Sequence, residues 1–423
     1  MKRFLIITQV FPPDPAAVGQ YLDEAAQALV KKGNAVEVLT AIRGYDNPNV
    51  VFDAKEVRDG IHIRRLKLAS LGKANLAVRI LAQLSFSIQC ILRGLFTPKL
   101  SDLLVSTSPP MASICAVIIG FFRPRLKVHY WVMDINPDQA VAMGKFGTGH
   151  PLVLAMNWLN RRILKRADSV IALDRFMKAR LEAKLHDPEK ELRAPIHVIP
   201  PWPMDDHLDP VAHADNPFRK ARGWENKFVV MYSGNHSIVH PLDTILDAAE
   251  KLADDPRFVF AFIGGGKGKA VVDRRIASEH HATSNLISLP YQPLAQIRYT
   301  LSAADLHIVS LGENMSGIVH PCKIYGALSI GRAVLTLGPK ESYLSDIIEP
   351  DQVSTINHQS SQVEPVGGSI EHGDIDAAVA TLKAAADQSE GERAAMQTRA
   401  HAAVQKNFSR SKLIADFLQS VSA

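Results

Sequence analysis

Residues 228–252 read FVVMYSGNHSIVHPLDTILDAAEKL, and this order of residue types predicts half of a βαβ unit. The apolar run at 228–232 is typical of a buried strand, and Gly234 permits a tight turn after it. Pro241 suits a first helical turn, and apolar residues then recur at helical spacing: Leu242, Ile245, Leu246, Ala249 and Leu252. Such a turn directs free N–H groups and the positive end of a helix dipole out of the sheet, which favours a bound phosphate. Close packing in a doubly wound domain is the other reason for a glycine here.

The chain has 423 residues, 47% hydrophobic and 22% charged, so it is long enough for two or three folded domains. Its three scattered cysteines, Cys90, Cys115 and Cys322, indicate a reducing compartment without a disulfide framework or structural zinc. The apolar run at the N-terminus stops at Pro12 and Pro13, so we interpret it as a first strand and not as a signal peptide.

The same alternation of strands and helices runs through both halves of the chain. Strands are predicted at residues 4–10, 35–40, 103–106, 127–133, 169–173, 196–199, 228–232, 258–263, 286–289, 306–309 and 333–337. A proline-rich stretch at 199–210 has the composition of a hinge. We therefore predict an α/β fold of two Rossmann-like, doubly wound domains facing each other across a cleft, residues 1–203 and 204–405, with a C-terminal helix at 406–423 that packs back towards the first. The opening βαβ unit lacks the G-x-G-x-x-G pattern of a dinucleotide site.

Basic residues gather in the N-terminal half: Arg43, Arg58, Arg64, Arg65, Lys67, Lys73, Arg79, Arg93, Lys99, Arg123, Arg125 and Lys127. They suit a phosphate or a phospholipid surface, although a solvated basic surface is the alternative. No zinc-finger spacing or RNA-binding signature accompanies them, so nucleic acid is not an expected partner.

Two apolar runs, residues 76–96 and 111–122, predict helices in the same half. Gln83, Ser85 and Gln89 interrupt the first, which makes a bilayer-spanning helix the least favoured interpretation. We expect these helices to pack one face on the sheet and to present another to a membrane surface through the basic and apolar residues of 76–127. Plain core helices remain the alternative.

Candidate site residues follow the ends of predicted strands. Asp134 directly follows the strand at 127–133, at the carboxyl end of the strand, where open α/β sheets place their chemistry. Asp138 either caps the next helix or contacts substrate. In the second half a glycine-rich turn, residues 264–269, could approach a phosphate or simply be flexible. Tyr291 and Leu294 offer a resting place for a base, and residues 316–331 form a glycine turn feeding a helix that carries Lys323.

The chain resembles glycosyltransferase family 4 in five segments and in their order. More narrowly, it is similar to the bacterial polysaccharide-assembly branch, whose members carry a D-x-x-P-[DE] segment and a P-S-K-x-Y helix start. The resemblance covers nearly the whole chain. Its segments are WVMDINPD at 131–138, YSGNHSIVHPL at 232–242, FIGGGKGK at 262–269, AADLHIVSL at 303–311 and HPCKIYGALSIGRAVL at 320–335.

The resemblance implies a GT-B fold, with a nucleotide diphosphate sugar in the C-terminal domain and the acceptor in the N-terminal one. It implies transfer with retention and without a metal, so that backbone N–H groups and cations stabilise the departing diphosphate. Asp134 would face the sugar or the acceptor hydroxyl, and Lys323 would give its charge to the diphosphate. The residues implied at the donor are Gly234, Asn235, His240, Gly264, Gly265, Tyr291, Leu294, Ser316, Gly317 and His320.

Within that set, Gly234, Asn235 and His240 would lie by the diphosphate, and Tyr291 with Leu294 would bracket the base. A retaining transfer needs no protein base, because the leaving phosphate can take the acceptor's proton. We therefore interpret His240 and His320 as hydrogen-bond donors to the donor molecule, with ordinary surface histidines as the alternative.

Several positions depart from the family pattern. Ile318 and Gly326 stand where the wider family has a Glu pair, and Cys322 replaces the serine of the P-S-K start. Asn235 and His240 stand where an Arg and a Lys are common. The N-terminal glycine-rich loop is thinned to FPPDPAAVGQY. Lys323 keeps a cation at the diphosphate.

The sequence thus predicts a retaining, metal-independent glycosyltransferase. It would move a hexosyl or N-acetylhexosaminyl group from a UDP-sugar, in preference to a GDP-sugar, to a lipid-linked or oligosaccharide acceptor in bacterial surface polysaccharide or lipopolysaccharide assembly. We expect it in the cytoplasm, on the inner face of the cytoplasmic membrane, with no cofactor besides the donor. The alternatives are a UDP-sugar 2-epimerase of the same fold and a non-catalytic nucleotide-sugar-binding protein.

Overall fold

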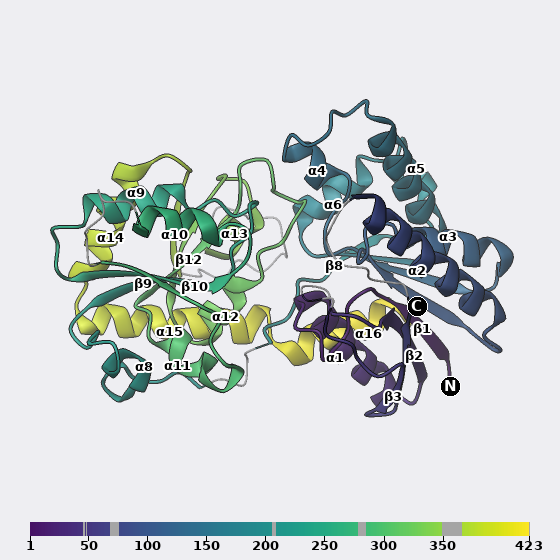
Figure 1. Cartoon of the computed structure of the whole chain (residues 1–423), viewed down its shortest axis with the longest axis horizontal. Helices are drawn as coiled ribbons and strands as arrows, with labels where there is room; N and C mark the ends of the chain where they lie inside the picture. Colours follow the sequence, from purple (N-terminus) through teal and green to yellow (C-terminus); the bar gives the residue numbers. More distant parts are fainter. Residues whose placement is uncertain are drawn as a thin grey trace. The chain divides into compact units, whose positions relative to one another are not determined.

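The chain divides into two compact units, each built around a sheet whose strands are all or mostly parallel (Figure 1). Unit 1 comprises Met1–Pro201, Gly317–His320 and Ser411–Ala423, and unit 2 comprises Trp202–Ser316 and Pro321–Arg410. The computed structural model describes residues 1–44, 47, 49–67, 76–204, 209–277, 285–348 and 366–422.

The sheet of unit 1 has eight strands in the described residues, in the order β3-β4-β2-β1-β5-β6-β7-β8. All neighbours pair in parallel except β3 and β4, which are antiparallel. Parallel strands covered on both faces are expected to be apolar throughout, and β5 is buried along its whole length. The strands are β1 (Arg3–Ile7), β2 (Ala35–Ala41), β3 (Lys55–Arg58), β4 (Ile61–Leu66), β5 (Asp102–Ser106), β6 (Lys127–Trp131), β7 (Ser169–Ala172) and β8 (Ile196–Val198).

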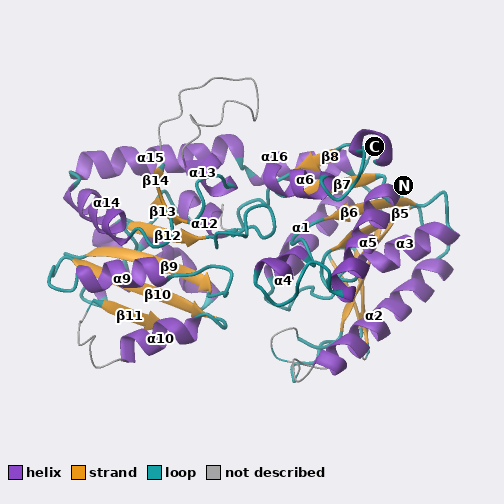
Figure 2. Cartoon of the chain, turned by 90° about the horizontal axis from the view of Figure 1, so that it is seen from above, coloured by secondary structure: helices purple, strands orange, loops and turns teal. Residues whose placement is uncertain are grey.

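Helices cover both faces of this sheet. The first packs on β2 and β4, whereas the second, third and fifth lie side by side (Figure 2). None of the helices in the described part of the chain combines the length and the apolar character that crossing a bilayer requires. The helices of unit 1 are α1 (Ala17–Lys31), α2 (Leu76–Phe96), α3 (Ser113–Phe122), α4 (Asp138–Ala142), α5 (Pro151–Arg166), α6 (Arg175–Glu182), α7 (Pro188–Glu191) and, from the end of the chain, α16 (Arg410–Ser420).

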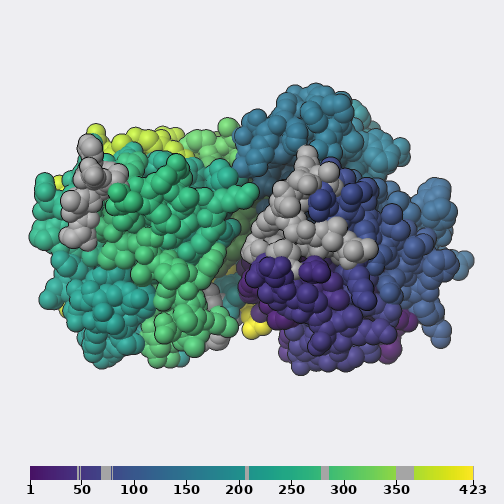
Figure 3. Space-filling model, viewed as in Figure 1, coloured from purple at the N-terminus to yellow at the C-terminus, as the bar shows by residue number. Residues whose placement is uncertain are grey.

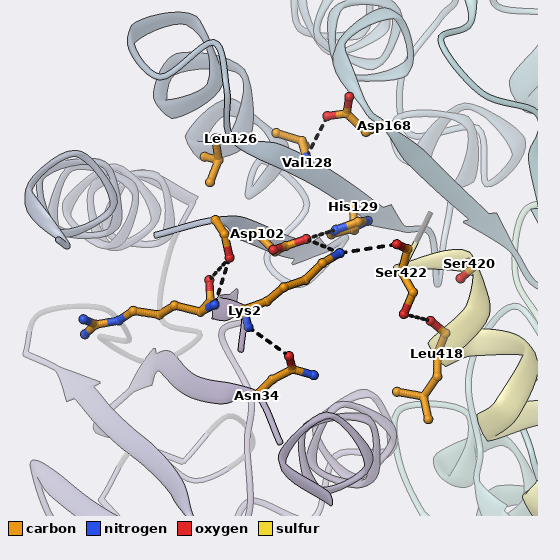
Figure 4. A network of polar contacts seen from close by, with 12 residues as sticks. Lys2, Asn34, Asp102, Leu126, Val128, His129, Asp168, Leu418, Ser420 and Ser422 are labelled. Atoms are coloured by element: carbon orange, nitrogen blue, oxygen red, sulfur yellow. Dashed lines mark hydrogen bonds and ion pairs between the residues drawn. The ribbon is translucent and has the colours of Figure 1, made fainter. Parts of the chain in front are cut away.

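Polar contacts and an aromatic pair hold the end of the chain in unit 1. The Lys2 ammonium lies 3.5 Å from the Asp102 carboxylate and donates to the Ser422 carbonyl at 3.4 Å (Figure 4). Asp102 also contacts the buried His129 ring at 3.1 Å. Phe417 of α16 is fully buried against Trp131, with ring centroids 4.9 Å apart.

Unit 2 contains a six-stranded parallel sheet in the described residues, in the order β11-β10-β9-β12-β13-β14. β9 is central and buried on both faces. Phe228, Val230 and Tyr232 join one core cluster, whereas Val229 and Met231 join another. The strands are β9 (Phe228–Asn235), β10 (Phe258–Gly265), β11 (Leu286–Leu289), β12 (Leu306–Ser310), β13 (Ala333–Leu337) and β14 (Gly367–Ile370).

The helical segments of unit 2 complete its layers. Ile245, Leu246 and Ala249 of α9 pack into the first core cluster, as their helical spacing predicts. The segments are η1 (His213–Asp215), α8 (Pro217–Lys220), α9 (Asp243–Lys251), α10 (Lys269–Ala277), η3 (Leu294–Gln296), α11 (Ile297–Ser302), α12 (Lys323–Ser329), α13 (Tyr343–Ile348), α14 (Ile375–Asp387) and α15 (Glu390–Asn407).

Two local expectations at residues 228–252 are wrong. Gly234 is not in a tight turn, because β9 continues to Asn235. Pro241 is outside the helix that follows, which begins at Asp243. The added strand length arises because β10 also continues to Gly265 and pairs with β9 along its whole length.

We predict that Phe417→Ala lowers the free energy of unfolding by about 3–5 kcal/mol, because it empties a filled site beside Trp131. Urea denaturation followed by tryptophan fluorescence measures this loss. Phe96→Ala removes the same ring from an exposed site and is expected to change stability by less than about 0.5 kcal/mol. If Phe417→Ala lowered the free energy of unfolding as little as Phe96→Ala does, the Phe417 ring would not stabilise the fold.

Candidate functional site

The carboxyl ends of β9 and β10 meet at two glycines. Gly234 and Gly264 stand opposite each other, with φ of 120° and 132°, a backbone region that side chains rarely adopt. A Cβ on Gly264 would lie 2.0 Å from the Gly234 carbonyl oxygen. The two strand ends therefore approach so closely that only glycine is tolerated at Gly264.

Lys323, the first residue of α12, lies against this strand end. A Cβ on Gly234 would be 3.0 Å from the Lys323 Cε, and the Lys323 ammonium is 5.2 Å from the centre of the Tyr232 ring. Burial lowers the pKa of Lys323 to about 8, and in the described part of the chain no carboxylate opposes that shift. A half-buried ammonium without a carboxylate beside it is suited to an anionic ligand.

Two histidines stand beside the lysine and are neutral at physiological pH. Burial, together with the Lys269 charge, lowers the pKa of His236 to about 4. Burial and the Lys323 charge lower the pKa of His240 to about 3. The local field is thus positive without contribution from either imidazole.

The tautomer of His236 follows from its partner. Its Nδ1 lies 3.0 Å from the Gly234 carbonyl oxygen, which can only accept, so Nδ1 carries the proton. Its Nε2 is then an acceptor, and it is buried without a partner among the described residues. The sequence pattern did not indicate a role for His236, although it lies within residues 228–252, because only the fold shows it to be buried.

A cavity of about 250 Å³ opens between these strand ends and α12, slightly smaller than the typical range for small-molecule sites. Tyr291 forms part of its wall and packs against Gly265, where a Cβ would come within 2.9 Å of the ring. Leu294 does not line this cavity and is 84% exposed. The lining residues include Ser233, Gly234, Ile263, Tyr291, Gln292, Thr300, His307, Lys323 and Gly326.

A larger hollow, of about 610 Å³, lies at the opposite edge of the same sheet. Its floor holds Arg219, which pairs with Asp305 at 2.9 Å and donates to the carbonyls of Ala303, Trp224 and Lys227. These contacts occupy the Arg219 guanidinium with structural partners, so it is not available to a ligand. We place the ligand site in the smaller cavity, because open parallel sheets bind ligands at the carboxyl ends of their strands.

The remaining donor candidates are distributed over both units. Asn235 is exposed at the end of β9. The Ser316 hydroxyl donates to the Glu341 carbonyl at 3.0 Å. Gly317 and His320 belong to unit 1.

Within unit 1 these two residues have structural partners. A Cβ on Gly317 would lie 2.6 Å from the Phe176 backbone. The buried His320 contacts Asp174 through Nδ1 at 3.0 Å, and Asp174 also accepts from the Met177 amide as the N-cap of α6. Gly317 and His320 thus have roles in the packing of unit 1 that the sequence alone did not indicate.

Asp134 lies just beyond β6 in unit 1. Its amide and that of Met133 both donate to the Thr107 hydroxyl, at 3.2 and 3.1 Å, which fixes the backbone there. Burial raises the pKa of the half-buried Asp134 carboxyl to about 6. Asp138 does not cap α4, which it begins, and instead forms a 2.6 Å ion pair with Lys184.

A family model described as "Glycosyl transferase 4-like domain" matches residues 16–202. The chain is 24% identical over 356 residues to the probable glycosyltransferase WbjE of Pseudomonas aeruginosa, covering 82% of this chain and 84% of the relative. It is also 24% identical over 354 residues to the putative colanic acid biosynthesis glycosyl transferase WcaI of Escherichia coli K12, covering 79% and 83%. These matches confirm the resemblance to glycosyltransferase family 4.

The fold comparison agrees with this assignment. Anabaena Alr3699/HepE, solved in complex with UDP and glucose, matches with a TM-score of 0.71, 14% identity and full coverage of both chains. The predicted GT-B fold is confirmed by this match and by the two predominantly parallel sheets. Gly326 lines the cavity at one position of the expected Glu pair, and the buried Ile318 occupies the other.

Lys323→Met is expected to stabilise the ligand-free protein by about 1–2 kcal/mol, because it removes a charge whose burial is uncompensated. The lysine loses its proton near pH 8 when folded but near 10.5 when unfolded. The unfolded chain therefore binds more protons in that window, and the stability of the natural protein rises with pH from about 8 to 10.5. Urea denaturation between pH 7 and about 10.5 should show the advantage of the variant shrinking as pH rises.

The matched control is Lys220→Met, since Lys220 is exposed on α8. This variant should follow the natural protein at each pH. A loss of stability in Lys323→Met across the whole range would show that the ammonium is compensated within the fold.

Proposed function

We propose that this glycosyltransferase moves a hexosyl or N-acetylhexosaminyl group from a UDP-sugar to a lipid-linked acceptor. Transfer proceeds with retention and without a metal, at the inner face of the cytoplasmic membrane, during surface polysaccharide or lipopolysaccharide assembly. The observation that carries the proposal is the contact between Lys323 and Gly234. It sets an uncompensated ammonium beside backbone at the carboxyl end of the central strand.

The donor's diphosphate fits this charge. Phosphate oxygens would accept from the Lys323 ammonium, in surroundings where burial strengthens the interaction. The exposed Asn235 and the backbone around Gly265 complete the polar surroundings. Because charge accumulates on the diphosphate as the sugar leaves, a lysine held in advance of that step stabilises the transition state.

The cavity beside Tyr291 supports a uridine donor. Its volume of about 250 Å³ has room for a nucleobase, and uridine is favoured because the structural neighbour Alr3699/HepE was solved with UDP and glucose. The Tyr291 ring provides a flat apolar wall against which a base can stack. No side chain projects from Gly326, which leaves space in the cavity where the wider family has a carboxylate.

The bond changes require no protein base. The bond between the anomeric carbon and the diphosphate oxygen breaks, and the acceptor oxygen bonds to the same face of the sugar. The acceptor's proton passes to the departing phosphate oxygen, so that UDP and the glycosylated acceptor are the products. His236 and His240, both neutral, contribute hydrogen bonds and not proton transfer.

A thermal-shift panel of UDP-, GDP- and dTDP-sugars tests the donor. The preferred donor at about a hundred times its Kd should add roughly 2.7 kcal/mol to the stability of the protein. We expect a UDP-sugar to give the largest shift. Lys323→Ala should abolish that shift, and the exposed Lys220→Ala should keep it. A purine donor giving the larger shift would contradict the assignment of a UDP-sugar.

Radiolabelled transfer separates the proposal from its two rivals. Labelled UDP-sugar with a polyprenyl diphosphate sugar should yield labelled lipid and UDP. Interconversion of the UDP-sugar without acceptor would instead identify a 2-epimerase. Donor binding without turnover on any lipid-linked acceptor would identify a nucleotide-sugar-binding protein.

Asp134 is assigned to an acceptor or sugar hydroxyl, which its carboxylate orients by accepting a hydrogen bond. Because burial raises its pKa to about 6, transfer should rise with pH through that value as the carboxyl loses its proton. Asp134→Asn should lower kcat about a hundredfold or more, remove that limb of the pH profile and leave UDP binding unchanged. Steady-state kinetics between pH 5 and 8 measures these effects.

Asp138→Asn is the matched control for that series. It changes a carboxyl four residues away that is already paired with Lys184, so the limb near pH 6 should persist. If Asp134→Asn transferred sugar at the natural rate, the assignment would be rejected.

A further inference from the structure

Helix α2 has two faces of opposite character. Its inner face is buried and carries Ala82, Phe86, Cys90 and Gly94 at intervals of four residues. The opposite face is also apolar but open to solvent: Leu81, Leu84, Ile88, Leu92 and Phe96. A helix that only completes a core carries polar residues on its outer face, so this exposed stripe requires another explanation.

Helix α3 extends the stripe at the end of α2. The two helices pack closely at Gly94, where a Cβ would lie 2.4 Å from the Ile119 side chain. Phe121 and Phe122, at the end of α3, are 77% and 65% exposed, and their rings meet edge to face at 5.2 Å. Together with Phe96, which is 80% exposed, they place three open aromatic rings in this region.

The neighbouring helix α5 shows a similar arrangement. It packs on α3, and it exposes Leu154 and Trp158 one turn apart. The Arg162 guanidinium lies 5.1 Å from the centre of the Trp158 ring. Aromatic rings flanked by cations are typical of protein segments at the boundary between lipid and water.

The charges around these helices are of one sign. Residues 76–133 include six Lys and Arg and a single acidic residue, Asp102, which is buried beside His129. Arg123 is engaged, because it donates to the carbonyls of Gly94, Thr97 and Leu100 and so closes the end of α2. Within the described part of residues 76–133, the exposed cations without a carboxylate partner are Arg93, Lys99, Arg125 and Lys127.

We propose that the outer surface of α2 and α3 is the face by which the protein lies on an anionic phospholipid bilayer. Phe96, Phe121, Phe122 and the leucines of α2 enter the acyl boundary, while the cations of 93–127 meet the lipid phosphates. This inference rests on the proposed function only in taking the acceptor to be lipid-linked. The partner is an anionic bilayer, and the surface that contacts it belongs to α2 and α3.

The charge pattern argues against a second copy of the chain as the occupant. Two such faces brought together would oppose four exposed cations on each side with no exposed carboxylate between them. An anionic bilayer, in contrast, supplies the opposite charge and an apolar interior at once.

Vesicle flotation tests the apolar contact. The full-length protein should float with vesicles of phosphatidylcholine and phosphatidylglycerol but not with phosphatidylcholine alone. Phe121→Ser with Phe122→Ser, and separately Leu84→Ser with Ile88→Ser, should weaken binding at least about tenfold, because each side chain loses its burial in lipid. Val51→Ser with Val57→Ser, which changes exposed valines elsewhere in unit 1, should bind as the natural protein does.

Arg125→Gln with Lys127→Gln tests the charge contact and should weaken binding about tenfold or more at low salt. Lys31→Gln with Lys32→Gln is the control for lost charge, because these lysines end α1. Every variant should keep the circular dichroism spectrum and the melting temperature of the natural protein, since all of these side chains are exposed.

Equal flotation by the natural protein and both serine pairs of α2 and α3 would overturn the proposal. Sedimentation showing a dimer that these serine pairs dissociate would also overturn it, in favour of a second copy. Failure of the sugar-transfer assay leaves flotation intact and counts against the proposed function alone. Conversely, the serine pairs should retain UDP-sugar binding and transfer to a detergent-dispersed acceptor, which separates loss of docking from loss of chemistry.

Discussion

The candidate site depends on one constraint: a half-buried lysine ammonium with no carboxylate beside it among the described residues. Lys323 loses solvation against Gly234 at the end of β9, and this loss disfavours its charged form and lowers its pKa. A protein keeps such a charge where a ligand supplies the opposite one, because an apolar residue of similar size would be more stable. The surrounding geometry follows from the need to bring this ammonium close to main chain.

That closeness depends on glycine at neighbouring strand ends. Gly264 has no Cβ, so the β10 backbone can reach the Gly234 carbonyl, and the same carbonyl accepts the proton of His236. Gly265 gives Tyr291 room to lie against the sheet, where its ring forms a wall of the cavity. The glycines at these two strand ends thus allow the close approach of the β9 and β10 backbones. They also place the carbonyl that fixes the His236 tautomer and make room for the Tyr291 ring.

Unit 1 has a different division of roles. The buried face of α2 and the tight contact at Gly94 complete the core, while the opposite face and the end of α3 keep exposed apolar rings among cations. The same helices can therefore stabilise the fold and contact a surface outside it. Only the buried face of α2 contributes to the core of unit 1, and the exposed face is free to contact another surface.

Local sequence patterns were enough to predict the alternation of strands and helices, the helix at Leu76–Phe96 and the presence of Lys323 beside a glycine-rich strand end. These follow from local periodicity and from residue chemistry, which act over a few residues. It did not reveal β3 and β4, whose Lys55–Arg58 and Ile61–Leu66 are rich in charge and so lack the apolar run of a buried strand. It also did not show that Leu294 is exposed, that His236 is buried, or that His320 pairs with Asp174. Burial and pairing between residues up to 146 positions apart are decided by tertiary packing, because the environment of a side chain is set by neighbours that no local pattern specifies.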